Sequence, residues 1–144
     1  MRLKNHTDLD DDWIRAVIRA VRPGGLSNFD VRVSNFNGAT GRGRAYWAGS
    51  GYHDRAAPFI VVSVATEKKF RRSVFAGHKG YLPHVWGSRK EVLIHLLAHE
   101  LRHLWQAKHS RGKVWGAKGR FSERDADAYA LQMLRRYRRG ELPC

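Results

Sequence analysis

Apolar residues in the first half of the chain follow a helical spacing first and strand-like spacings afterwards. Over residues 8–21 they recur every three or four positions behind an acidic start, and a Pro-Gly-Gly sequence at 23–25 ends the pattern. Alternation over 29–33 and a β-branched run over 58–64 predict two strands, and 44–48 predicts another between them. We therefore expect an N-terminal helix followed by a small, mostly antiparallel sheet.

Two longer helical patterns dominate the second half. Ser88 and Glu91 form an S-x-x-E capping box that predicts a helix over about 89–107, and its apolar residues surround it almost completely. A helix of that kind is typically buried. Ser122 is expected to cap a second helix over 122–138. The stretch 68–86 contains glycines and a proline, and it is predicted as a long loop with room for a short helix.

The predicted buried helix carries the sequence H-E-L-R-H, from His99 to His103. Two histidines four residues apart lie one above the other on a helix, so their ring nitrogens can share one metal ion. Glu100 projects toward the same open side and can take a proton from a metal-bound water. This arrangement is typical of zinc metallopeptidases. The alternative is two core histidines bonded to backbone, with Glu100 facing solvent.

Two residues compete as third metal ligand, and His109 is the first. It follows His99 by ten residues, a spacing used in H-E-x-x-H-x-x-G-x-x-H enzymes, where a glycine lets the chain turn back. This chain has Gln106 at the position of that glycine. If the helix continues, His109 lies six residues beyond His103 and off the metal-binding face.

Glu123, near the start of the second helix, is the other candidate. Its carboxylate can bind the metal, while that of Asp127, one turn later, can accept the ring N–H of a liganding histidine. An acidic start that complements the helix dipole would also explain both acids. We favour metal binding because the same face carries the small residues Ala126 and Ala130, where close helix packing is expected.

The chain from about 88 to 137 resembles known zinc peptidases. H-E-x-x-H followed, twenty residues after its second histidine, by E-x-x-x-D resembles the gluzincin class. The sequence E-R-D-A-D-A-Y-A of the second helix is similar to the E-x-x-A-[ND]-x-[FY]-A signature of the ImmA/IrrE-like family. The resemblance implies one Zn²⁺ held by His99, His103 and Glu123, with Glu100 as general base. The resemblance also implies a minimal zincin-like α+β domain. It implies that the protein is a small intracellular protease, and that its substrate is a protein such as a repressor or another DNA-bound protein.

Two parts of this expected site stay open. The resemblance implies that an edge strand before the metal helix pairs with the substrate backbone, and both 44–48 and 59–64 are candidates. The tetrahedral oxyanion would need a hydrogen-bond donor, for which His95, His109 and Tyr129 are the candidates.

Composition limits the setting of the protein. A chain of 144 residues predicts a single domain over 1–144, and we expect a monomer. Its one cysteine, Cys144, excludes an internal disulfide and a cysteine zinc cluster. The sequence has no apolar stretch long enough to span a bilayer and no apolar signal segment, so we expect a cytoplasmic protein without a membrane partner.

The formal net charge is +14, with basic residues concentrated at 68–72, 108–118 and 135–139. Such charge favours acidic partners, nucleic acid first, and the alternative is a solvated basic face. The sequence therefore predicts a zinc-dependent metalloendopeptidase. The alternatives are a nucleic-acid-associated or repressor-binding module with a zincin fold and little or no proteolytic activity, or an interaction protein. Glu100 favours the protease, because a purely structural metal site needs no base beside it.

Overall fold

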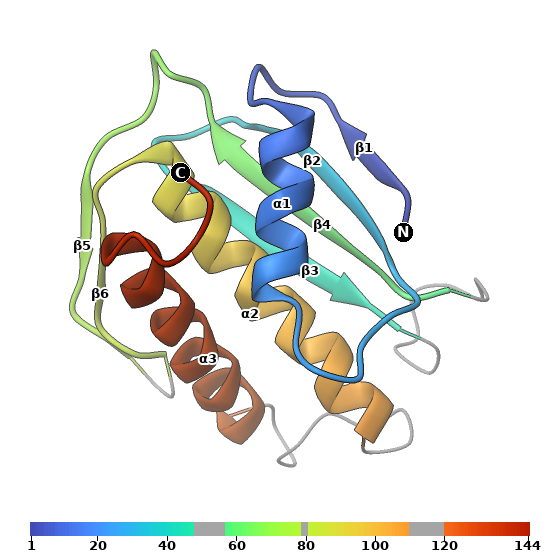
Figure 1. Cartoon of the computed structure of the whole chain (residues 1–144). Helices are drawn as coiled ribbons and strands as arrows, with labels where there is room; N and C mark the ends of the chain where they lie inside the picture. The colour runs from blue at the N-terminus through green and yellow to red at the C-terminus, as the bar shows by residue number, and fades with distance from the viewer. Residues whose placement is uncertain (48–56, 79–80, 110–119) are drawn as a thin grey trace.

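The structure is a computed structural model that describes residues 1–47, 57–78, 81–109 and 120–144. Within these ranges the fold is α+β, as predicted, with three helices and two sheets (Figure 1). The helices are α1 (Asp11–Val21), α2 (Arg89–His109) and α3 (Arg120–Arg138). The larger sheet contains β1 (Leu3–Asn5), β2 (Asp30–Phe36), β3 (Gly41–Tyr46) and β4 (Phe59–Ala65). The smaller sheet pairs β5 (Ser73–Phe75) with β6 (His84–Trp86).

The larger sheet is mixed, so the expectation of a mostly antiparallel sheet is wrong. Its strand order is β1-β2-β4-β3, with β1–β2 and β2–β4 parallel and β3–β4 antiparallel. The most apolar strand, β4, takes a central place between β2 and β3, as β-branched runs commonly do. This order makes β3 an edge strand and β4 an internal one, which decides between the two edge candidates.

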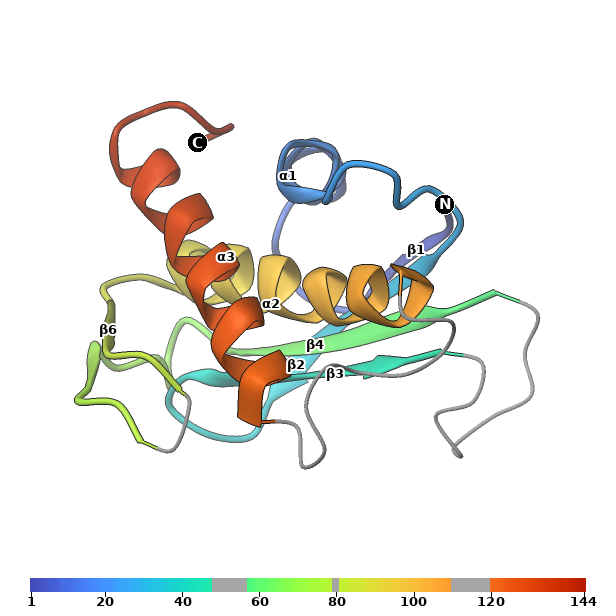
Figure 2. The same cartoon turned by 90° about the horizontal axis from the view of Figure 1, so that it is seen from below.

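Helices α1 and α2 lie on one side of this sheet, and α3 packs against α2 (Figure 2). Helix α2 crosses the sheet between α1 and α3, and its residues Leu93, Leu97 and Leu101 are completely buried. It lies very close to β3: a Cβ added at Gly41 would be 2.8 Å from Val92 Cγ1, and one at Gly43 would be 2.8 Å from Glu100 Cγ. The edge strand therefore reaches α2 where that helix carries the H-E-x-x-H sequence.

The helix ends follow the predicted signals in part. Helix α1 begins after Asp10, whose Oδ2 accepts the Trp13 N–H at 2.8 Å, and Ser88 Oγ accepts the Glu91 N–H at 3.2 Å as the capping box requires. Helix α3 begins at Arg120, so Ser122 lies inside it and is not its N-cap. Ser122 is buried under α2, and its carbonyl accepts a hydrogen bond from Gln106.

The stretch 68–86 also differs from its prediction. It contains β5 and β6, which pair with one another, where the sequence predicts a loop. Each of these strands is three residues long, too short to show a periodicity in the sequence. No helix within the described ranges is long and apolar enough to cross a membrane.

Candidate metal centre

Helices α2 and α3 bring three potential ligand side chains together. His99 Nε2 lies 3.1 Å from His103 Nε2 and 3.0 Å from Glu123 Oε2, and His103 Nε2 lies 3.0 Å from Glu123 Oε1. Tetrahedral zinc with bonds of about 2.0–2.1 Å places its ligand atoms about 3.3 Å apart. The triangle formed by these three side chains is therefore of the size that one such ion requires.

The remaining ring nitrogens determine which tautomers are present. His99 Nδ1 lies 2.7 Å from Asp127 Oδ1, so it carries the hydrogen of that contact. His103 Nδ1 lies 2.9 Å from Gln106 Oε1. The Gln106 Nε2 donates to the Ser122 carbonyl and to Asp125 Oδ2, both at 2.9 Å. These two bonds fix the orientation of the amide group, so its Oε1 is the atom that accepts the hydrogen of His103 Nδ1. In their neutral forms, both histidines thus direct an Nε2 lone pair into the triangle.

Two lone pairs and a carboxylate at this distance repel one another unless positive charge lies among them. Burial lowers the pKa of His99, but its hydrogen bonds with Asp127 and Glu123 outweigh that effect and raise the pKa to about 10. Burial raises the pKa of Glu123, but hydrogen bonds from His103 and His99 prevail and lower it to about 2. The site therefore attracts a cation, and two imidazoles with one carboxylate are a donor set that suits zinc.

A second group of potential metal ligands contains His95, His99 and Asp127, with one ligand atom of each within 4.8 Å of the others. There, Asp127 Oδ1 already accepts the His99 Nδ1 hydrogen, and Oδ2 accepts the Leu82 N–H at 2.9 Å. These contacts fit the expected role of Asp127, which is to hold the ring of His99 in place.

Glu100 lies beside the triangle. One of its carboxylate oxygens is within 4.8 Å of ring nitrogens of His99 and His103, and the residue is 6% exposed. Burial raises the pKa of the Glu100 carboxyl group. The alternative in which Glu100 faces solvent is wrong for this fold, because β3 covers it at Gly43.

The triangle opens into a cavity of about 600 Å³. Its walls include Gly43, Arg44 and Ala45 of the edge strand β3, the metal-binding face of α2, and Glu123 of α3. Tyr81 and Trp86 also line it, from the segment that contains the smaller sheet. A ligand in this cavity would contact the edge strand and the candidate metal centre together.

The other sequence candidates lie elsewhere. His109 is exposed at the end of α2, where its Nδ1 contacts the Trp105 carbonyl at 2.9 Å and its ring stacks on Trp105. It is off the metal-binding face because α2 continues as a regular helix. The Tyr129 hydroxyl donates to the Val21 carbonyl, and His95 Nε2 faces Asp127 at 3.7 Å. His109 and Tyr129 therefore lie away from the triangle, whereas His95 lines the cavity beside it.

The sequence analysis does not identify the roles of two residues of the site, Gln106 and Tyr81. Gln106 is completely buried, and its side chain contacts His103. The one available signal in the sequence is a polar residue three positions after His103 on a helix that is predicted to be buried. Tyr81 lines the cavity near Glu123, and burial followed by the nearby charge of Glu123 raises the pKa of Tyr81 to about 12. No sequence pattern points to Tyr81, which lies in the stretch predicted as a loop.

No family model, curated protein or solved structure matches this chain.

Metal binding should release protons near neutral pH. A pKa of about 10 keeps the His99 imidazole protonated in the metal-free protein, whereas a metal ion needs its neutral form. Calorimetric titration with Zn²⁺ in buffers of different ionisation enthalpy should give about one released proton per ion at about pH 7, and the affinity should rise with pH.

The His109→Ala variant is the matched control and should release the same number of protons. Zinc binding without proton release at about pH 7 would contradict the protonation state assigned to His99.

Proposed function

We propose that this protein is a zinc-dependent metalloendopeptidase of the gluzincin type that hydrolyses peptide bonds of a protein substrate. The observation that carries the proposal is the convergence of His99, His103 and Glu123 at 3.0–3.1 Å, with the buried carboxyl group of Glu100 beside them. The spacing of these residues resembles that of the ImmA/IrrE-like family, which supports the same reaction class.

In this proposal His99, His103 and Glu123 hold zinc, which polarises the scissile carbonyl group and activates the attacking water. Glu100 accepts the proton of that water and later delivers it to the leaving amine. Its burial supports this role, because a raised pKa makes a carboxyl group better suited to accept and return a proton near neutral pH. A metal site with a purely structural function would not need such a buried carboxyl group.

The edge strand β3 is the proposed docking place for the substrate backbone. It is the outermost strand on its side of the larger sheet, and its residues 43–45 line the cavity. Gly43 has no side chain, so the strand can lie directly against Glu100. A peptide that adds to this edge would be held by main-chain hydrogen bonds, with loose selectivity for sequence.

Tyr81 is the proposed donor to the oxyanion, in place of the three candidates from the sequence. Tyr81 lines the cavity together with Glu123, His99 and His103. With a pKa of about 12, its hydroxyl group keeps its proton throughout the neutral range and can donate it in a hydrogen bond.

The Glu100→Gln variant tests the general base. It should keep zinc, measured by elemental analysis, and lose about 10²- to 10⁴-fold in the rate of cleaving an unstructured reporter protein, because the amide cannot accept the proton. Glu67→Gln, an exposed glutamate on a turn, is the matched control and should leave both quantities unchanged. Undiminished cleavage by Glu100→Gln would remove this residue from the mechanism.

The Tyr81→Phe variant tests the oxyanion donor. It should lower kcat by about 10²- to 10³-fold with little change in KM, because a single donor to the transition state is lost. Tyr129→Phe removes a hydroxyl group that binds the Val21 carbonyl away from the triangle, and kcat should stay near wild type. If Tyr81→Phe cleaves at the wild-type rate, the donor is another group.

A further inference from the structure

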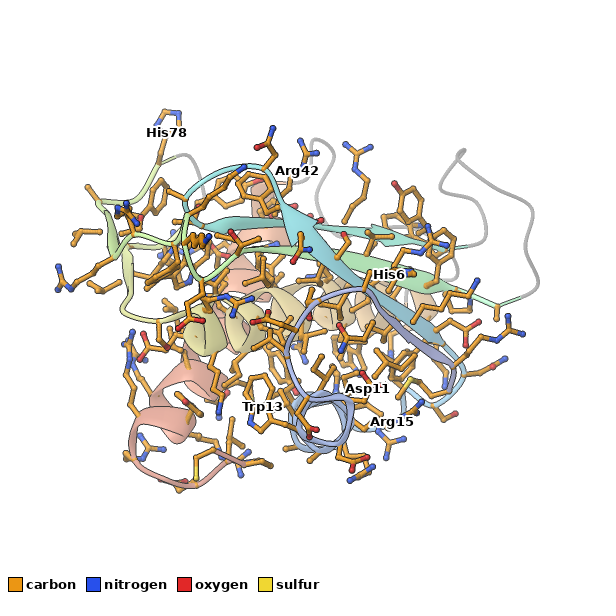
Figure 3. All side chains as sticks on the ribbon, turned by 90° about the horizontal axis from the view of Figure 1, so that it is seen from above. His6, Asp11, Trp13, Arg15, Arg42 and His78 are labelled. Carbon is orange, nitrogen blue, oxygen red and sulfur yellow. The ribbon has the colours of Figure 1, made fainter. Side chains whose placement is uncertain are left out.

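The larger sheet has a second face, opposite the side on which α1 and α2 lie (Figure 2). Side chains of a strand alternate between the two faces, and the inner face is marked by buried residues such as Val33 and Val62. The outer face therefore carries the residues between them. Figure 3 shows Arg42 on this side of the sheet, whereas Trp13 and Arg15 of α1 lie on the other.

Basic residues from three strands form a row across the outer face. Lys4 of β1 is in register with Arg32 of β2, Arg32 with Val61 of β4, and Val61 with Arg44 of β3. Residues in register share a face of the sheet, and Arg42 is two positions from Arg44 on the same strand. Lys4, Arg32, Arg42 and Arg44 are all exposed. The fold thus gathers cations that are dispersed in the sequence.

Few acidic residues accompany these cations within the four strands themselves. Among the described residues of the four strands, Asp30 is the one acid, and its Oδ1 accepts the backbone N–H of Arg2 at 2.9 Å. The basic runs of the sequence, at 68–72, 108–118 and 135–139, are not part of the four strands that form this face. Arg138 is paired with Glu91 and Arg139 with Glu141, while 110–118 lies outside the described residues.

Aromatic rings lie among these cations. Tyr46 and Phe59 are cross-strand partners on the outer face, with ring centroids 4.6 Å apart and planes inclined by 14°. Phe36 of β2 is on the same face, and the Arg42 guanidinium lies 6.0 Å from the centre of its ring. Cations that track a phosphate backbone, combined with aromatic rings on which bases stack, are what single-strand-binding surfaces use.

We propose that the outer face of the larger sheet, carrying Lys4, Arg32, Arg42 and Arg44, binds single-stranded DNA. A duplex hides the faces of its bases from rings on a sheet, whereas a single strand exposes them. The Ser34 and Ser63 hydroxyl groups of this face hydrogen-bond to one another at 2.9 Å, so charge and rings dominate what the surface offers. Neither of those requires a ribose 2′-hydroxyl group, so single-stranded DNA offers everything that this surface can bind.

Most of this binding face lies away from the proposed proteolytic centre. Glu100 contacts the strand β3 at Gly43, whereas Arg42 alternates with that residue and faces the other way. Arg44 also lines the cavity of the proposed centre, so it is left unchanged in the variants that test the binding face. The Glu100→Gln variant should therefore bind DNA as the wild type does, whether or not the protein proves to be a peptidase.

The double variant Arg32→Glu/Arg42→Glu tests the proposal. Its affinity for a labelled single-stranded oligonucleotide of mixed sequence, measured by fluorescence anisotropy, should fall at least about tenfold at low salt. The dependence of log K on log salt should become shallower by roughly 0.7 for each cation removed. The neutral pair Arg32→Gln/Arg42→Gln should give an intermediate loss, which separates lost attraction from introduced repulsion.

The matched control is Arg15→Glu/Arg19→Glu, which makes the same change of net charge on α1, on the helix side of the sheet. It should bind the oligonucleotide more tightly than the sheet variant does, and both variants should keep wild-type circular dichroism and zinc content. Equal losses in the two variants would overturn the proposal. So would equal or tighter binding of duplex DNA or of anionic phospholipid vesicles.

Discussion

Electrostatic repulsion within the candidate metal centre is the constraint on which the rest of this structure depends. Two imidazole nitrogens and a carboxylate meet at 3.0–3.1 Å between α2 and α3, where both histidines are buried. Asp127 and Gln106 hold the far sides of the two rings, so neither histidine can turn its lone pair away. A cation relieves this repulsion, and in its absence bound protons must do so.

The larger sheet packs against α2, the helix that carries two residues of this centre, and its two faces differ in chemistry. Its inner face packs on α2, and its edge strand β3 meets the helix at Gly41 and Gly43, where any side chain would prevent the approach. Its outer face carries exposed cations from three strands. The same alternation of residues along β3 therefore serves a proposed proteolytic cleft on one side and a proposed DNA-binding face on the other.

Sequence alone predicts those features that depend on local periodicity. The continuous helical pattern of α2 correctly places His109 off the metal-binding face, and helical spacing correctly places Glu123 and Asp127 on one side of α3. The roles of Gln106 and Tyr81 could not be predicted in this way, because both depend on tertiary contacts with distant segments. The central place of β4, which makes the sheet mixed, likewise depends on pairing between distant strands.

Zinc stoichiometry by elemental analysis tests the central claim most directly. The wild type and His109→Ala should each hold about one zinc ion per chain, while His103→Ala and Glu123→Ala should lose it, because each removes one of three ligands. Retention of zinc by Glu123→Ala together with its loss from His109→Ala would contradict the account and transfer the role of third ligand to the histidine.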